Sequence, residues 1–392
     1  MNNNQLALLE LLKASIFGLI PEFPPEFDWD KVLEEANAQA VTAIAANAIP
    51  EEYSAPWKIV IMQNQARFIQ VLHGQSQLIN LFLIKEIPLV ILKGTAVAKY
   101  YSNPYLRTMG DVDFLVFPEQ FDEAADLLMT NGYKCIQEKG VNPRHMEFIK
   151  NGILFELHHH FSSDGFACDS ILGKAMFNRI GCELNHYEFP TLPDMENGLV
   201  ILGHIQQHLK ENGLGIRPII DWMMFVHACL PDDVWEKEFR GLAQVVGLER
   251  LAINITKMCK NWLGLPDLIT WCDSGNDELV EELLSILFEC GNMGRSAGTL
   301  RDPVEEVSLQ IKRKGLFRWL YDYGCSDWPV AKKYRILIPL SMINGIGKLA
   351  LKGIKAKMNG TNITEQMAKG NDRHELYKKL GLNYTNRMPE DA

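Results

Sequence analysis

The feature that most limits how this chain can fold is a pair of aspartates inside an apolar segment, DVDFLV at residues 111–116. In a β-strand successive side chains point to opposite faces, so Asp111 and Asp113 share one face while apolar residues line the other. Two carboxylates that lose water side by side repel each other unless a cation lies between them. Because magnesium binds carboxylate oxygens and keeps positions for phosphate, the pair predicts a magnesium or manganese site that serves phosphate chemistry.

The residues upstream of this pair also suit phosphate binding. An apolar run at 87–92 (IPLVIL) ends at Lys93 and Gly94, which predicts a strand followed by a turn. Thr95 is placed to cap a helix expected at 96–101, and backbone N–H groups at the start of a helix hold phosphate oxygens. These surroundings favour the metal interpretation over a chance pair in which one carboxylate caps a loop and the other faces solvent.

A third carboxylate, Glu156, lies in an apolar strand expected at 153–160 (ILFELHHH). If that strand continues to its last residue, Glu156, His158 and His160 share a face, and a zinc or iron site becomes the rival interpretation. That site would leave the aspartate pair without a purpose. We therefore expect His158 to support Glu156 or to pack beside the active site.

Hydrophobic spacing along the rest of the chain predicts an α+β protein. Residues before 85 and after 193 follow helical spacing, with helices expected at 29–46, 197–211 and 232–246 among others. Between them short apolar runs alternate with helices, and further strands are expected at 133–137 and 145–150. We expect a helical N-terminal region at 1–85, a mixed core at 86–190, a helical domain at 191–300, and a C-terminal helical segment with a polar tail at 301–392.

These segments resemble the nucleotidyltransferase superfamily that includes DNA polymerase β, whose pattern is a Gly turn, a helix, a D-x-D strand and a third acidic residue. Residues 87–117 and 155–161 (FELHHHF) resemble, within it, the family described as uncharacterised bacterial nucleotidyltransferases, through the lysine-glycine turn, the arginine before D-x-D and the acidic-apolar-His strand. The resemblance implies a polymerase-β-like core with a mixed sheet and flanking helices. It also implies transfer of a nucleoside monophosphate from a magnesium-bound NTP, expected to be ATP, to a hydroxyl or phosphate acceptor.

Carried over to this sequence, the resemblance makes Gly94 and Thr95 the turn that holds the triphosphate. It makes Asp111 and Asp113 ligands of magnesium, and Glu156 the third carboxylate, which binds metal and orients or deprotonates the acceptor. In the superfamily's two-metal scheme the metals stabilise the entering and leaving oxygens, and pyrophosphate leaves. Two departures are a longer segment between the turn and the aspartates, and Thr in place of Gly or Ser.

Several further residues are candidates for contact with the nucleotide. The planar fork of Arg107 suits phosphate oxygens, although a surface ion pair with a nearby acid is an equal alternative. Lys93, beside the Gly turn, can reach a phosphate. His158 is a further candidate for contact with the nucleotide. Arg217 and Asp221 lie four residues apart in an apolar helix, where an Arg-Asp pair braces helices or contributes to the nucleotide or acceptor site.

Another pair of histidines, His204 and His208, lies four residues apart in a segment of helical spacing. A metalloprotease helix needs Glu directly after the first His, and this chain has Ile205 there. We therefore expect two histidines that are satisfied within the helix rather than a metal site.

Charge and cysteine content limit the partners and the compartment. The chain of 392 residues has 39 Lys and Arg against 49 Asp and Glu, a net charge of -10, which suits nucleic acid poorly. The expected acceptor is a small molecule, a glycan precursor or a protein. Eight separated cysteines without a C-x-x-C pair, and a start without the basic region of a signal peptide, predict a cytoplasmic protein.

Residues 331–358 combine basic and apolar side chains. Their uncharged run at 336–347 is shorter than the about 20 apolar residues that span a bilayer. This stretch is either a basic amphipathic helix that touches an anionic membrane surface or a core helix with a solvated basic face.

A function of a different class also fits the same fold. A non-catalytic nucleotide-binding or antitoxin-like module would keep the core and act by protein contact. Such a module has no need of three carboxylates, so we favour the enzyme.

Overall fold

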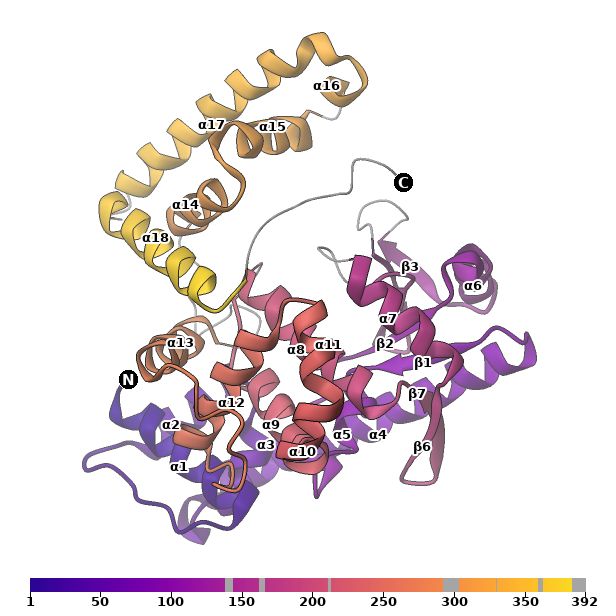
Figure 1. The fold of residues 1–392 in the computed structure, drawn as a ribbon, viewed down its shortest axis with the longest axis vertical. Coiled ribbons are helices and arrows are strands. Elements are labelled where there is room, and N and C mark those ends of the chain that lie inside the picture. Colours follow the sequence, from indigo (N-terminus) through magenta and orange to yellow (C-terminus); the bar gives the residue numbers. More distant parts are fainter. Residues whose placement is uncertain are drawn as a thin grey trace. The chain divides into compact units, whose positions relative to one another are not determined.

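The computed structural model describes residues 1–137, 144–161, 166–210, 213–291, 303–328, 330–358 and 362–382. The chain forms two compact units, Met1–Ala297 and Gly298–Ala392 (Figure 1). The first unit contains a sheet surrounded by helices, and the described part of the second consists of helices. The predicted division into four parts stays a prediction.

A seven-stranded mixed sheet forms the centre of the first unit, with the strand order β3-β4-β5-β2-β1-β7-β6. The strand β2 pairs with β1 in antiparallel and with β5 in parallel orientation, and β1 also pairs with β7 in parallel. Three hairpins, β3-β4, β4-β5 and β6-β7, supply the other pairings. The strands are β1 (Leu89–Leu92), β2 (Asp111–Val116), β3 (Lys134–Gln137), β4 (His145–Lys150), β5 (Ile153–His158), β6 (Ile180–Leu184) and β7 (Tyr187–Thr191). The predicted α+β class is confirmed.

The two faces of this sheet carry separate cores. On one face, strand residues such as Phe114 and Phe155 pack with helix α4 (Ser54–Ile84) and helix α6 (Phe121–Thr130). On the other face, Val90, Leu92 and Leu115 of the central strands pack with Leu172 and Met176 of helix α7 (Phe166–Phe177). Because strand side chains alternate, the aspartates of β2 lie on this second face, where the apolar core is smaller.

Helices cover the rest of the first unit. They are α1 (Asn3–Phe17), α2 (Trp29–Ala38), α3 (Thr42–Ala45), α5 (Gly94–Ala98), α8 (Asp194–Lys210), α9 (Arg217–Cys229), α10 (Asp232–Val234), α11 (Arg240–Val245), α12 (Glu249–Leu263) and α13 (Asp277–Cys290). The helix predicted at 29–46 is interrupted after Ala38, because Ala40 takes a positive φ of 55°. The helix predicted at 232–246 contains a π-helical turn at Trp235–Phe239.

The hairpin β6-β7 and helix α7 were not predicted from the sequence. The hairpin turns at Asn185 and His186, which have φ values of 49° and 64°. Two consecutive residues with positive φ form the two-residue turn that matches strand twist, and Asn is one of the residues that adopts it easily. The Asn between alternating segments (CELNHYEF) was therefore an available signal.

The second unit contains α14 (Pro303–Lys314), α15 (Leu316–Asp327), α16 (Val330–Lys333), α17 (Ile338–Met358) and α18 (Ile363–Lys379). Helix α18 falls in the predicted polar tail and buries Leu376 and Tyr377. None of the described helices in either unit is both long and apolar enough to cross a bilayer.

Candidate functional site

The pairing of β2 with β5 brings the predicted carboxylates together. In the parallel register, Asp113 lies opposite Glu156, and Leu115 lies opposite His158. Opposed residues in neighbouring strands point to the same face, so Asp111, Asp113 and Glu156 share the face with the smaller core. The three carboxylates that the sequence singled out therefore lie on one face of adjacent strands.

A cation and an imidazole compensate the buried Asp113. The Nζ of Lys93 lies 2.5 Å from Asp113 Oδ1, and that carboxylate is only 2% exposed. The Nε2 of His158 lies 3.1 Å from the same oxygen and 3.3 Å from Glu156 Oε2. Lys93 and His158 therefore contact the carboxylates directly, and their predicted contacts with a nucleotide stay predictions.

Burial and neighbouring charges set the protonation of this cluster. Burial raises the pKa of Asp111, and the nearby charge of Asp113 adds to the rise. Burial acts in the same direction on Glu156, but the hydrogen bond from His158 and the charge of Lys93 outweigh it and hold that pKa at about 2. A carboxylate with such a pKa is a poor proton acceptor at neutral pH. Its geometry and charge favour a role as ligand and hydrogen-bond acceptor.

The turn that carries Lys93 has an unusual backbone. Lys93 has φ 46° and ψ -141°, and Gly94 follows with φ 38° at the start of α5. Positive φ costs a residue with a Cβ on the order of 1–3 kcal/mol, and such residues concentrate at functional sites. The strained conformation accompanies the placement of the Lys93 ammonium against Asp113.

The hydroxyl of Thr95 is used inside the protein. Thr95 is fully buried, and its Oγ1 donates a 2.7 Å hydrogen bond to Oε1 of Gln75 on α4. The side chain therefore joins the turn to α4. The phosphate contact stays a prediction, for which the backbone N–H of Thr95 is the remaining donor.

Replacing Thr95 by valine is expected to lower the free energy of unfolding by about 1–3 kcal/mol, because the buried Gln75 oxygen loses its donor. Urea unfolding would measure this change, and Thr95→Ser, which keeps the hydroxyl, serves as the control. Unchanged stability together with weaker nucleotide binding would instead assign the hydroxyl to the ligand.

A buried ion pair engages Arg107. Its Nε and Nη2 donate to Oδ1 and Oδ2 of Asp221 on α9, each at 2.8 Å, and the Tyr101 hydroxyl donates to Oδ1 at 2.7 Å. Burial would lower the pKa of Arg107, but Asp221 outweighs it and raises that pKa. The same pairing holds the pKa of Asp221 below its ordinary value despite burial. Helical spacing had suggested that Asp221 pairs with Arg217. In the structure its hydrogen-bonded partner is Arg107.

Arg217 is left with few partners and lies near the carboxylates. Its Nη1 donates a long 3.4 Å hydrogen bond to the Thr108 carbonyl, and its buried Nε has no hydrogen-bond partner among the described residues. Burial and the charge of Arg107 lower its pKa, while Asp221 and Asp111 oppose that effect. Arg217 therefore has donors to offer to an anion.

The histidine pair of α8 faces the same charges. The rings of His204 and His208 lie 4.3 Å apart between centroids. Burial, followed by the charge of Lys93, lowers the pKa of His204 well below its ordinary value and that of His208 to about 4. The lowered pKa values favour neutral imidazoles at both positions, and the prediction of two histidines satisfied within the helix stays a prediction. Their four-residue spacing in a helix was the available signal.

The rival metal site takes a different third ligand. The strand β5 ends at His158, and His160 Nδ1 lies 3.5 Å from Asp169 Oδ2. In its place His145, opposite His158 in the β4-β5 register, joins Glu156 and His158, with ligand atoms all within 4.8 Å of one another. The sequence analysis missed His145 because its position opposite His158 depends on the register of β4 and β5. The H-x-E pattern at 145–147 was an available signal, since alternate residues of a strand share a face.

The two possible ligand sets differ in chemistry. Asp111, Asp113 and Glu156 offer oxygen atoms, which suit magnesium or manganese, whereas the His145-containing set offers two nitrogens and suits a transition metal. The oxygen set also fits because the single Lys93 ammonium, which pairs with Asp113, balances only one of its three carboxylates and leaves excess negative charge for a divalent cation. The residues present therefore fit a hard divalent cation next to the Lys93 turn.

A comparison with models of protein families shows the family of the chain. The sequence model of a family described as uncharacterised nucleotidyltransferase matches residues 25–264, well over half of the chain. A crystal structure of an antigenic nucleotidyltransferase-like protein from Paracoccidioides brasiliensis is similar over 50% of this chain and 92% of its own, with 12% identity and a TM-score of 0.32. A search of curated proteins returned no match.

Proposed function

Because the chain belongs to the family of uncharacterised nucleotidyltransferases, we propose that it transfers a nucleoside monophosphate from a magnesium-bound NTP to a hydroxyl or phosphate acceptor. ATP is the proposed donor, and pyrophosphate is the leaving group. The bond from the acceptor oxygen to the α-phosphorus forms as the bond from that phosphorus to the pyrophosphate oxygen breaks.

One observation carries this proposal. The register of β2 and β5 sets Asp113 opposite Glu156, and the Lys93 ammonium contacts Asp113. Three carboxylates and a lysine on one sheet face are costly to bury without a ligand that uses them. Phosphate transfer uses both kinds of group, because carboxylates bind the divalent metal and the lysine binds phosphate oxygens.

Each residue has a proposed role. Lys93 and Arg217 would bind phosphate oxygens, and the N–H groups of the Lys93-Gly94 turn would add to them. Asp111, Asp113 and Glu156 would hold the divalent metals, which when bound neutralise charge on the phosphates and on the entering and leaving oxygens. Glu156 would also orient the acceptor hydroxyl, since its low pKa disfavours proton removal.

The acceptor is proposed by class. A small molecule, a glycan precursor or a protein side chain suits the core equally, and the net charge of -10 disfavours nucleic acid.

The test is calorimetric titration of the full chain with ATP, GTP, CTP and UTP, with and without magnesium. We expect magnesium-dependent binding of one NTP. The double variant Asp111→Asn with Asp113→Asn is expected to lose that binding, because the neutral amides attract a divalent cation far less. His160→Gln serves as a control, since His160 lies outside the carboxylate cluster. Absence of binding to all four NTPs in folded protein would favour the non-catalytic interaction module.

A further inference from the structure

Helix α17 of the second unit leaves a row of large apolar side chains exposed. Leu340, Ile343, Ile346 and Leu351 are 56%, 65%, 51% and 67% exposed. At 100° per residue these four lie within an arc of roughly 140° on one side of the helix. We call these four residues the apolar row. Isolated exposed apolar residues are ordinary, but a continuous row marks an interaction surface.

The other side of α17 packs within the unit. Gly345 approaches the ring of Tyr323, and a Cβ on Gly324 would meet the Ser341 carbonyl oxygen at 2.5 Å. Glycines therefore let α15 and α17 pack closely through that side. At 100° per residue, Ser341 and Gly345 lie on the side of α17 opposite the middle of the apolar row.

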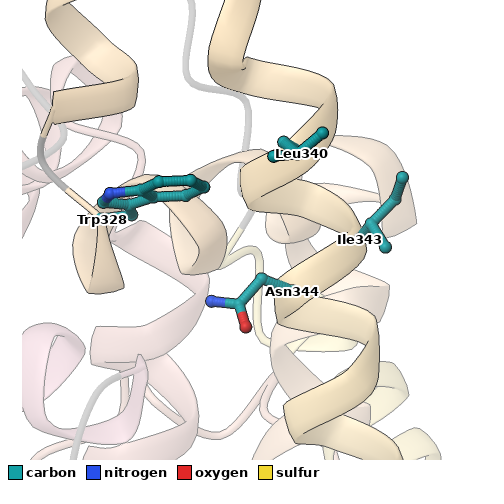
Figure 2. A pocket seen from close by; sticks show the side chains of 4 residues that line it. All are labelled: Trp328, Leu340, Ile343 and Asn344. Carbon is teal, nitrogen blue, oxygen red and sulfur yellow. The ribbon is translucent and has the colours of Figure 1, made fainter.

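A hollow adjoins the apolar row. It has a volume of about 510 Å³ and is lined by Trp328, Leu340, Ile343 and Asn344. Figure 2 shows the indole of Trp328 on one side and the α17 turn that bears the other three residues on the opposite side. The hollow extends the exposed apolar surface, and it adds an indole, the side chain that is enriched at membrane interfaces.

The charge around the apolar row has the opposite sign to that of the chain. From Trp328 to Thr364 the sequence contains seven Lys or Arg and no Asp or Glu, whereas the whole chain has a net charge of -10. Lys348 and Lys357 are exposed on α17. Protein interfaces are depleted of lysine, whereas anionic lipid headgroups attract it. Apolar side chains flanked by lysines therefore match a lipid surface better than a protein partner.

We propose that α17 and Trp328 bind the chain to the surface of an anionic membrane. The apolar row would enter the boundary between headgroups and acyl chains, and the basic residues would contact the headgroups. The helix would lie in the plane of the surface, since no described helix can cross a bilayer. This inference does not depend on the proposed nucleotidyl transfer.

The test is sedimentation of the full chain with phosphatidylcholine vesicles, with and without a minority of phosphatidylglycerol. We expect binding to the anionic vesicles only, and weaker binding as salt is added, because salt screens the lysines. Equal binding to both kinds of vesicle, or no binding to either, would overturn the proposal.

Two variants separate the apolar and the basic contributions. Ile343→Glu is expected to weaken vesicle binding at least tenfold, while Ile84→Glu, at an exposed isoleucine of the first unit, leaves it unchanged. Lys348→Glu with Lys357→Glu is expected to weaken binding by roughly 30-fold and to flatten its salt dependence. If Ile343→Glu instead abolishes self-association measured by light scattering without changing vesicle binding, the row is an interface between copies and the membrane proposal is wrong.

Discussion

Replacing Glu156 by glutamine is expected to slow nucleotidyl transfer by on the order of 10²–10³-fold, as loss of a positioning and charge-stabilising group does, while NTP binding changes only a few-fold. Glutamine keeps the size of the side chain but removes the charge that would bind metal and orient the acceptor hydroxyl. The groups proposed to bind the triphosphate, Lys93 and Arg217, remain in place. The rate would be measured as pyrophosphate release from the NTP that calorimetry identifies.

A matched control lies on the neighbouring strand. Glu147 of β4 is directly opposite Glu156, and its side chain is 27% exposed. Glu147→Gln is expected to leave the rate within a few-fold of the original. A transfer rate unaffected by Glu156→Gln would remove this residue from the mechanism. Equal losses in both variants would point to a ligand set centred on β4.

Removing the side chain of Arg107 is expected to lower the free energy of unfolding by about 3–5 kcal/mol. Arg107→Ala would leave the Asp221 carboxylate buried and without its bidentate partner. Arg107→Lys is expected to recover only part of the loss, because an ammonium cannot form both hydrogen bonds. Replacing both partners, as in Arg107→Met with Asp221→Leu, is expected to be far less harmful than Arg107→Ala. Chemical denaturation measures all three.

The free energy of unfolding that Arg107→Ala loses should become smaller as the pH falls. Arg107 holds the pKa of Asp221 below its ordinary value, so the pair contributes stability above the unfolded pKa that is lost as pH falls through the folded pKa. In Arg107→Ala the buried carboxylate has no such support, and protonation relieves its burial. The difference between the variant and the original protein should therefore shrink as pH falls toward the ordinary Asp range. Normal stability with weaker NTP binding would instead assign Arg107 to the nucleotide.

The local part of the site could be predicted from the sequence. Alternation in a strand was enough to place Asp111 and Asp113 on one face, and the lone acid in an apolar run identified Glu156. The strand expected at 111–116 matches β2, and the strands predicted at 145–150 and 153–160 agree closely with β4 and β5. These inferences depended only on periodicity within a few residues.

The long-range part of the site was not predictable in the same way. Arg107 and Asp221 are 114 residues apart, whereas Arg217 is one helical turn from the same carboxylate, so spacing favoured the wrong partner. His145 joins Glu156 and His158 only through the antiparallel register of β4 and β5. Thr95 has the residue type of a phosphate turn, yet its hydroxyl faces Gln75. Each of these contacts depends on how distant elements pack.

The parallel pairing of β2 with β5 has a consequence for how the chain tolerates change. No tight turn connects these strands, so their alignment depends on side chains such as Phe155 and Leu157, which are buried on the opposite face. A shift by one residue would turn Glu156 into the apolar core and Phe155 toward the carboxylates. Residues that lie on the opposite face of the sheet from the carboxylates, such as Phe155 and Leu157, thus fix the strand register on which the site depends. A single-residue deletion within β5 is therefore expected to abolish function outright, although it need not remove any residue of the site.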